Sequence, residues 1–164
     1  MLIARIKLII EPMLKAPYIL LAEDSDDDAF FAHRCFRIAG VKVDLKRCEN
    51  GVDACADLKR CGADLPLGVI LDLKMPLMDG FETLKWIRDQ PGFKHLPVVI
   101  LSSSDIPEDK KRAQKLGCTE YLVKPNSIKA LEALLKELVE RLLARATVAL
   151  SESGSVTVKP GRTP

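Results

Sequence analysis

The stretch VILDLKMPLMDG, residues 69–80, decides the fold, because an apolar run ends abruptly at a carboxylate and a loop follows. The run from Val69 to Leu71 shows no polar alternation, which is typical of a strand covered on both faces in a parallel sheet. Open α/β sheets bind ligands at the carboxyl ends of their strands. Asp72 is therefore a candidate for chemistry, and the alternative is a strand-end aspartate that caps a turn.

The length and composition fit one globular domain. The chain has 164 residues, of which 48% are hydrophobic and 29% are charged, and its formal net charge is +2. This length suffices for one sizeable core and is too short for two substantial domains. The small net charge neither favours nor excludes an electrostatic partner.

The cysteines and the first residues indicate a cytoplasmic protein without a zinc site. The five cysteines form no CxxC pair, and His33 and His95 lie apart from them in the sequence. An odd number of cysteines without a secretory signal favours reduced thiols. Residues 1–10 are apolar but are interrupted by Arg5 and Lys7, so they indicate neither a signal peptide nor a membrane span.

Apolar runs and helical patterns alternate along the chain. Each of five short strands is followed by a segment with apolar residues three or four positions apart. Such alternation forms βαβ units, with a parallel sheet and helices on both faces. We therefore expect a (βα)5 doubly wound, five-stranded parallel sheet. Its strands would lie near 18–22, 41–47, 69–71, 97–101 and 121–123. Its helices would lie over 26–39, from the loop at 50–51 to about 60, from the turn at 75–80 to about 90, over 107–117 and over 127–145.

The third and fifth helices show the clearest patterns. The third has an apolar stripe typical of core packing, and Trp86 lies off this stripe and is expected to be exposed; the stripe is Leu77, Phe81, Leu84 and Ile87. Asn126 or Ser127 caps the fifth helix, whose apolar side carries Ile128, Leu131, Leu135, Leu138 and Leu142. Gly40 is expected to end the first helix.

The predicted strands end in polar side chains that a parallel sheet brings to one edge. The first ends at Glu23 and Asp24, the third at Asp72, the fourth at Ser102 and the fifth at Lys124. Neighbouring carboxylates repel one another, and Mg²⁺, which takes oxygen ligands, relieves that repulsion. A carboxylate, a cation, a lysine and a hydroxyl suit phosphoryl transfer, with Asp72 as the nucleophile that forms an acyl phosphate.

These motifs resemble the receiver domain of two-component response regulators. The features that carry the resemblance are an acidic pair, a phosphoacceptor loop, a switch hydroxyl, a switch aromatic residue and a lysine–proline pair. In this sequence they are Leu21-Ala22-Glu23-Asp24, Asp72-Leu73-Lys74-Met75-Pro76 with Asp79-Gly80, Ser102, Tyr121 and Lys124-Pro125. The resemblance divides the chain into an N-terminal extension (1–17), a receiver domain (18–145) and a flexible C-terminal tail (146–164). It implies the flavodoxin-like receiver fold and a signalling domain rather than an enzyme.

The resemblance also implies roles for the acidic residues. Asp72 would accept a phosphoryl group from a sensor histidine kinase or a phosphotransfer protein. Mg²⁺ would be held by Asp24, Asp72 and the backbone carbonyl of Lys74, with Glu23 acting largely through water. Glu23 stands where the family often has Asp, and this difference does not remove the chemistry.

On the same resemblance, Ser102 and Lys124 contact the arriving phosphoryl group, and Tyr121 turns inward as Ser102 moves. Ser102 stands where the family often has Thr, which also supplies a hydroxyl. The Lys124–Pro125 peptide bond is expected to be cis, an isomer that costs about 0.5–1 kcal/mol relative to trans before proline.

Partners are a further expectation. The loop before Asp72 and the run 96–105 resemble a subgroup of single-domain regulators, some of which partner bacterial phytochromes. The fourth helix, the fifth strand and the fifth helix form the face that would switch, bind a downstream protein and support a homodimer; the alternative output is a phosphate relay. About twenty residues follow the last predicted helix, too few for a helix-turn-helix, so DNA binding by this chain is not expected.

Two other functions remain open. A phosphatase of the haloacid dehalogenase type uses an aspartate nucleophile on a similar sheet, but it places a second carboxylate where this chain has Lys74. A receiver-like scaffold would bind its partner without phosphorylation. The three functions differ in phosphate uptake on Asp72, in steady turnover of a phosphate ester, and in the effect of Asp72→Asn on partner affinity.

Overall fold

The computed structural model describes residues 16–38 and 43–153 of the chain, and within them strands and helices alternate as predicted. The elements are β1 (Tyr18–Ala22), α2 (Asp26–Ile38), β2 (Asp44–Cys48), α3 (Gly51–Arg60), β3 (Val69–Leu71), α4 (Gly80–Asp89), the 3₁₀ helix η1 (Pro91–Phe93), β4 (Val98–Ser102), α5 (Pro107–Lys115), β5 (Glu120–Val123) and α6 (Ile128–Ser153). The predicted helix end at Ala39 and Gly40 lies outside the described residues.

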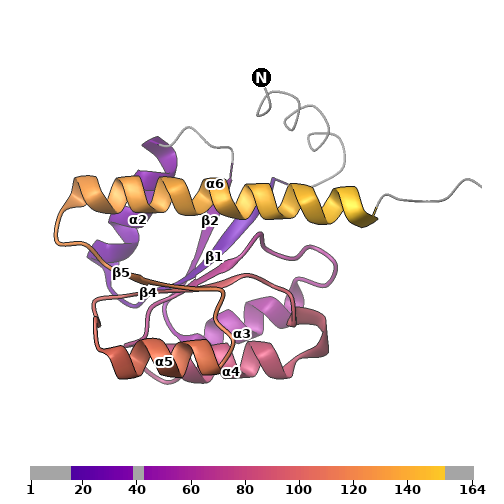
Figure 1. Cartoon of the computed structure of the whole chain (residues 1–164), viewed down its shortest axis with the longest axis horizontal. Coiled ribbons are helices and arrows are strands. Elements are labelled where there is room, and N and C mark those ends of the chain that lie inside the picture. The colour runs from indigo at the N-terminus through magenta and orange to yellow at the C-terminus, as the bar shows by residue number, and fades with distance from the viewer. Residues whose placement is uncertain (1–15, 39–42, 154–164) are drawn as a thin grey trace, which may run out of the picture.

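The strands form one parallel sheet in the order β2-β1-β3-β4-β5. Helices α2 and α6 cover one face, and α3, α4 and α5 cover the other (Figure 1). The predicted doubly wound, flavodoxin-like fold is therefore confirmed. The strand order reverses between β1 and β3, and the crevice at such a reversal is where open α/β sheets bind ligands.

Strand β3 has no polar alternation because each of its faces meets a separate apolar core. Val69 and Leu71 pack into the core beneath α3, α4 and α5, whereas Ile70 packs into the core beneath α2 and α6. All three side chains are buried. Asp72, the next residue, is held at the edge of the sheet because its N–H donates to the carbonyl of Ala22 at 2.9 Å.

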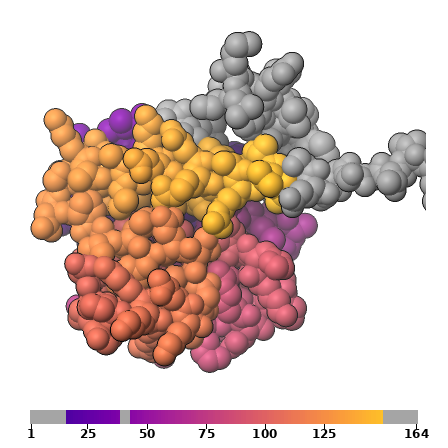
Figure 2. Space-filling model, in the orientation of Figure 1, coloured from indigo at the N-terminus to yellow at the C-terminus, as the bar shows by residue number. Residues whose placement is uncertain are grey.

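Helix α6 is longer than predicted. It was expected to end near Arg145, but it continues to Ser153 and forms a ridge along the molecule (Figure 2). Residues 146–153 contain neither proline nor glycine, so nothing in their backbone chemistry stops the helix. The capping prediction is confirmed for Ser127, whose Oγ accepts the N–H of Ala130. No helix within the described ranges is both long and apolar enough to span a membrane.

The assignment of Leu77 to the buried stripe of the third helix is wrong. Its side chain is 84% exposed and its φ is 66°, in the loop before α4. Helix α4 begins at Gly80, because Asp79 forms a capping box with Glu82. The rest of the stripe is buried as predicted. The expectation that Trp86 is exposed is wrong, because its ring is half-buried against Phe93 and beneath the ammonium of Lys59.

The predicted extension and tail fall mostly outside the described residues. Residues 1–15 and 154–164 are not described, so the role of the extension and the flexibility of the tail stay predictions. The part of the predicted tail that is described, residues 146–153, is helical.

Candidate functional site

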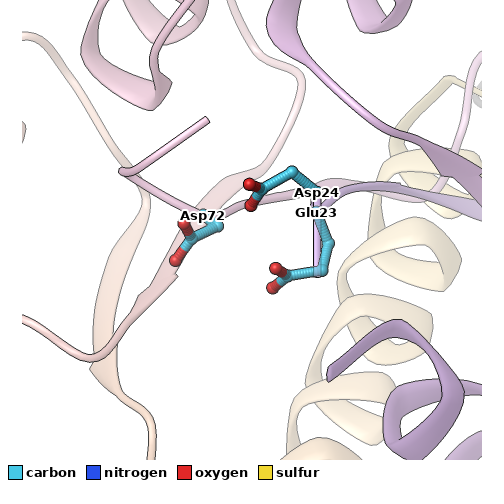
Figure 3. Close-up of side chains that lie close together, drawn as sticks. All are labelled: Glu23, Asp24 and Asp72. Carbon is cyan, nitrogen blue, oxygen red and sulfur yellow. The ribbon is translucent and has the colours of Figure 1, made fainter. Parts of the chain in front are cut away.

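Three carboxylates meet where β1 and β3 end. Glu23 and Asp24 follow β1, Asp72 follows β3, and one oxygen from each lies within 4.8 Å of the others. Figure 3 shows the three side chains close together. The sequence prediction that these residues come together at one edge of the sheet is therefore confirmed in geometry.

The environments of these carboxylates differ. Glu23 is 3% exposed and Asp72 is 7% exposed, whereas Asp24 is exposed to solvent. Burial raises the pKa of Glu23, even though its carboxylate pairs with a lysine. One oxygen of Asp72 accepts the backbone N–H of Lys74 at 2.8 Å. That bond leaves the other oxygen for the lysine described next.

Lys124 supplies positive charge to this group of acids. Its Nζ lies 2.6 Å from Oε2 of Glu23, 2.6 Å from Oδ2 of Asp28 and 3.3 Å from Oδ1 of Asp72. The carboxylates of Asp28, Glu23 and Asp72 raise the pKa of Lys124 above its ordinary value, although burial lowers it. One ammonium thus serves three carboxylates while Asp24 lies beside them, so the site has an excess of negative charge that suits a divalent cation.

Ser102 and Tyr121 lie along the same edge. The buried hydroxyl of Ser102 accepts the N–H of Ser104 at 3.2 Å, and the carbonyl of Ser102 accepts the N–H of Lys124 at 2.8 Å. The half-buried Tyr121 donates its hydroxyl to the carbonyl of Ser104 at 2.9 Å, and burial raises its pKa. Both predicted switch residues therefore contact the loop that follows β4.

The loop between Asp72 and α4 is tightly packed. A Cβ on Gly80 would lie 2.3 Å from the carbonyl oxygen of Asp72 and 2.9 Å from Cα of Leu73, closer than real Cβ atoms approach. The N–H of Gly80 donates to the carbonyl of Leu73 at 3.1 Å. Glycine at this position therefore lets the start of α4 rest directly on the backbone that carries the carboxylate.

The expected cis bond before Pro125 is wrong. Within the described residues no peptide bond is cis, so the Lys124–Pro125 bond is trans. Trans is the lower-energy isomer before proline, and Lys124 reaches its carboxylates in this conformation.

Two residues of the site were not predicted from the sequence. Asp28 pairs with Lys124, and Arg47 binds the loop after β1. Arg47 donates from Nε to the carbonyl of Glu23 at 2.9 Å, from Nη2 to the carbonyl of Asp24 at 3.0 Å and from Nη1 to Asp26 at 2.7 Å. Arg47 could have been found from the sequence by its position near the carboxyl end of β2, since that strand ends at the same edge of the sheet.

Comparison with known proteins identifies the family. Residues 19–136 match the response regulator receiver domain family. The chain is 33% identical over 126 residues to the probable methanogenesis regulatory protein FilR2 of Methanothrix harundinacea. This alignment covers 74% of this chain and 81% of that protein. It is 32% identical over 124 residues to the sensor histidine kinase CheAY of Helicobacter pylori. This alignment covers 75% of this chain but 15% of that protein.

Solved structures agree with this match. The phosphorylated cyanobacterial phytochrome response regulator RcpA superposes with a TM-score of 0.74 and 27% identity, over 80% of this chain and 96% of RcpA. The Mn²⁺-bound form of response regulator Rcp1 superposes with a TM-score of 0.68 and 26% identity, over 90% of this chain and 99% of Rcp1. With its five-stranded doubly wound sheet and its acidic edge, the chain belongs to the response regulator receiver domain family, a family of two-component signalling domains.

Proposed function

We propose that the chain is a response regulator of the single-domain type that accepts a phosphoryl group on Asp72. The observation that carries the proposal is the meeting of Glu23, Asp24 and Asp72 beside one lysine, with more negative than positive charge. Phosphoryl transfer depends on positioning and charge neutralisation, and this edge of the sheet offers both.

The proposed reaction needs a phosphodonor. A carboxylate oxygen of Asp72 attacks phosphorus of a phosphohistidine on a sensor kinase or a phosphotransfer protein. A P–O bond to Asp72 forms as the P–N bond breaks, and the imidazole nitrogen leaves with the electron pair. Lys124, 3.3 Å from Asp72, neutralises charge on the transferred oxygens, and the hydroxyl of Ser102 donates to one of them. Hydrolysis by water returns the free carboxylate.

We propose Mg²⁺ as the cofactor, and the donor set fits it. Carboxylate oxygens are its usual protein ligands, and one oxygen from each of Glu23, Asp24 and Asp72 lies within 4.8 Å of the others. Asp24, Asp72 and the backbone carbonyl of Lys74 would hold the ion, with Glu23 acting largely through water. The ion would neutralise charge on the phosphoryl oxygens. The Mn²⁺ bound to Rcp1 supports this assignment.

The proposed partners are a sensor kinase, of phytochrome type by the likeness to RcpA, and a downstream protein in the cytoplasm. The output surface would be formed by α5, β5 and α6, because Ser102 and Tyr121 link the site to the loop before α5. The same surface would support a homodimer, and phosphorylation would shift the population of its arrangements.

The test is phosphate uptake from acetyl phosphate, followed by intact-mass spectrometry. The wild type is expected to gain one phosphoryl group when Mg²⁺ is present and to lose the gain in chelator. Asp72→Asn should gain none, whereas Asp89→Asn, which changes an exposed aspartate of α4, should behave as the wild type. Uptake that persists in Asp72→Asn would remove the proposal. Steady hydrolysis of a phosphate ester would favour the phosphatase, and partner affinity unchanged by Asp72→Asn would favour the scaffold.

A further inference from the structure

We propose that Asp28 is a positioning residue that directs the ammonium of Lys124 toward Asp72. The proposal rests on the proposed function, since it concerns how Lys124 meets the phosphoryl group. Asp28 lies on the first turn of α2, and Lys124 follows β5. Their contact joins the start of α2 to the residue that follows β5, and Asp28 is not one of the three clustered carboxylates.

The ammonium of Lys124 meets three carboxylates at unequal distances. A lysine has three N–H donors and no acceptor. The bonds to Glu23 and Asp28 are both 2.6 Å, whereas the approach to Asp72 is 3.3 Å. These two short bonds hold the ammonium beside Asp72, with which it forms an ion pair rather than a hydrogen bond. If one of them is removed, the ammonium can move away from Asp72.

Free space lies beside Lys124. Its side chain borders a cavity of about 200 Å³, lined on the apolar side by Leu21, Leu101, Leu131 and Leu135. Asp28 lines the same cavity. A side chain with this much free space beside it needs its ion pairs to stay in one orientation.

Asp28 is itself held in place. Its backbone N–H donates to Oγ of Ser25 at 3.3 Å at the start of α2. Asp26, on the same turn, is used differently, because it pairs with Arg47. The exposed Asp27 carries the same charge one position away and provides a matched control.

Charge alone and positioning predict opposite effects of removing Asp28. Loss of a negative charge beside the site would speed reaction with an anionic phosphodonor, because repulsion falls. Loss of a positioning contact would slow it, because Lys124 would no longer face the phosphoryl oxygens. The direction of the change therefore separates the two.

The experiment measures the rate of phosphorylation by acetyl phosphate with Mg²⁺. We expect Asp28→Ala to be several-fold slower than the wild type and Asp28→Asn, which keeps an acceptor oxygen, to lie between them. Asp27→Ala should match the wild type. A rate for Asp28→Ala equal to or above that of the wild type would overturn the proposal, and so would a loss of equal size in Asp27→Ala.

A second readout needs neither metal nor phosphate. In ¹H–¹⁵N spectra of lysine ammonium groups, the signal of Lys124, assigned by its absence in Lys124→Ala, should shift or broaden in Asp28→Ala and remain in Asp27→Ala. An unchanged signal would overturn the positioning contact. If the wild type takes up no phosphate, the proposed function fails, and the role of Asp28 in phosphorylation fails with it. The contact between Asp28 and Lys124 is tested separately, because a lysine signal of the unphosphorylated protein that responds to Asp28→Ala establishes it. Slower phosphorylation in Asp28→Asn, whose side chain has the same shape, excludes misfolding as the cause.

Discussion

Glu23 shows at the level of one residue what burial does to a carboxylate of this site. Its carboxylate is buried, accepts the N–H of Ser25 at 3.1 Å and pairs with Lys124 at 2.6 Å. Its pKa is nevertheless raised, because the cost of burial exceeds the help from these two partners and Asp72 adds a repulsion. The folded protein without metal therefore holds the ionised Glu23 at a cost in stability.

The pH dependence of stability tests this reading. A raised pKa means that the folded state binds the proton of Glu23 more tightly than the unfolded state does. The contribution of Glu23 to the free energy of unfolding therefore falls as the pH rises from its ordinary value, 4.5, through the raised value. Glu23→Gln removes this dependence, so its stability relative to the wild type should increase across that window in urea unfolding without metal.

The matched control is Glu140→Gln, at an exposed position on α6. Its stability relative to the wild type should change much less over the same window. A Glu23→Gln difference that stays flat, or that decreases with rising pH, would contradict the raised pKa of Glu23 and the cost of burying its carboxylate.

Among the elements, the loop from β3 to α4 depends on Gly80. A Cβ there meets the backbone of Asp72 and Leu73, which cannot move as a flexible side chain can. Gly80→Ala should therefore lower the free energy of unfolding by about 1–3 kcal/mol, the usual cost of overpacking. It should also slow phosphorylation, because the backbone that carries Asp72 must shift.

Gly92→Ala is the control for this prediction, since a Cβ on Gly92 would meet no atom within 4 Å. Urea unfolding of both variants would measure the difference. Equal stability of the two variants would show that the backbone around Gly80 accommodates a Cβ without cost, contrary to the short distances to Asp72 and Leu73.

The loop between β1 and α2 depends on Arg47, which binds two of its carbonyls and Asp26. Arg47→Gln removes a positive charge near the site, so simple electrostatics predicts tighter Mg²⁺ binding. We expect weaker binding instead, by about 10-fold, because partners that orient ligands usually contribute at least this much.

Titration calorimetry with Mg²⁺ measures this effect. Lys46→Gln is the control, because Lys46 neighbours Arg47 but pairs with Asp57 at 3.0 Å. Tighter binding in Arg47→Gln than in Lys46→Gln would mean that the charge of Arg47 outweighs its role in holding the loop.

The same elements show how far sequence patterns reach. Strand β3 was predictable because burial on both faces leaves an unbroken apolar run, and helix α4 was predictable because its apolar residues recur three or four positions apart. Leu77 was misassigned because helical spacing continues backwards into the loop without showing where the first helical bond forms. The contact of Asp28 with Lys124 joins residues 96 positions apart and depends on how the first turn of α2 is rotated. Residue spacing contains no such information.

On the scale of the whole molecule, one sheet joins two cores and carries the site at its edge. The cores lie on opposite faces of the same strands, so we expect unfolding in one cooperative transition. A ligand that binds the folded state stabilises it by mass action, by about 2.7 kcal/mol at 100 times its Kd. Mg²⁺ should therefore raise the Tm of the wild type.

Asp24→Asn should remove most of this rise in Tm, because it takes one carboxylate from the cluster, and Asp89→Asn should retain it. Calorimetric scans with and without Mg²⁺ make the comparison. A rise of the same size in Asp24→Asn would place the metal elsewhere.

The central claim is that the carboxylate of Asp72 accepts the phosphoryl group, and the most direct test is to locate the acyl phosphate. Borohydride reduces an acyl phosphate to a primary alcohol, so the accepting aspartate becomes homoserine. Peptide mass spectrometry of the phosphorylated, reduced protein should find homoserine at position 72, and only after phosphodonor and Mg²⁺ were both present. Reduction at Asp24 or at another acid, or no reduction in protein that has gained phosphate, would contradict the account.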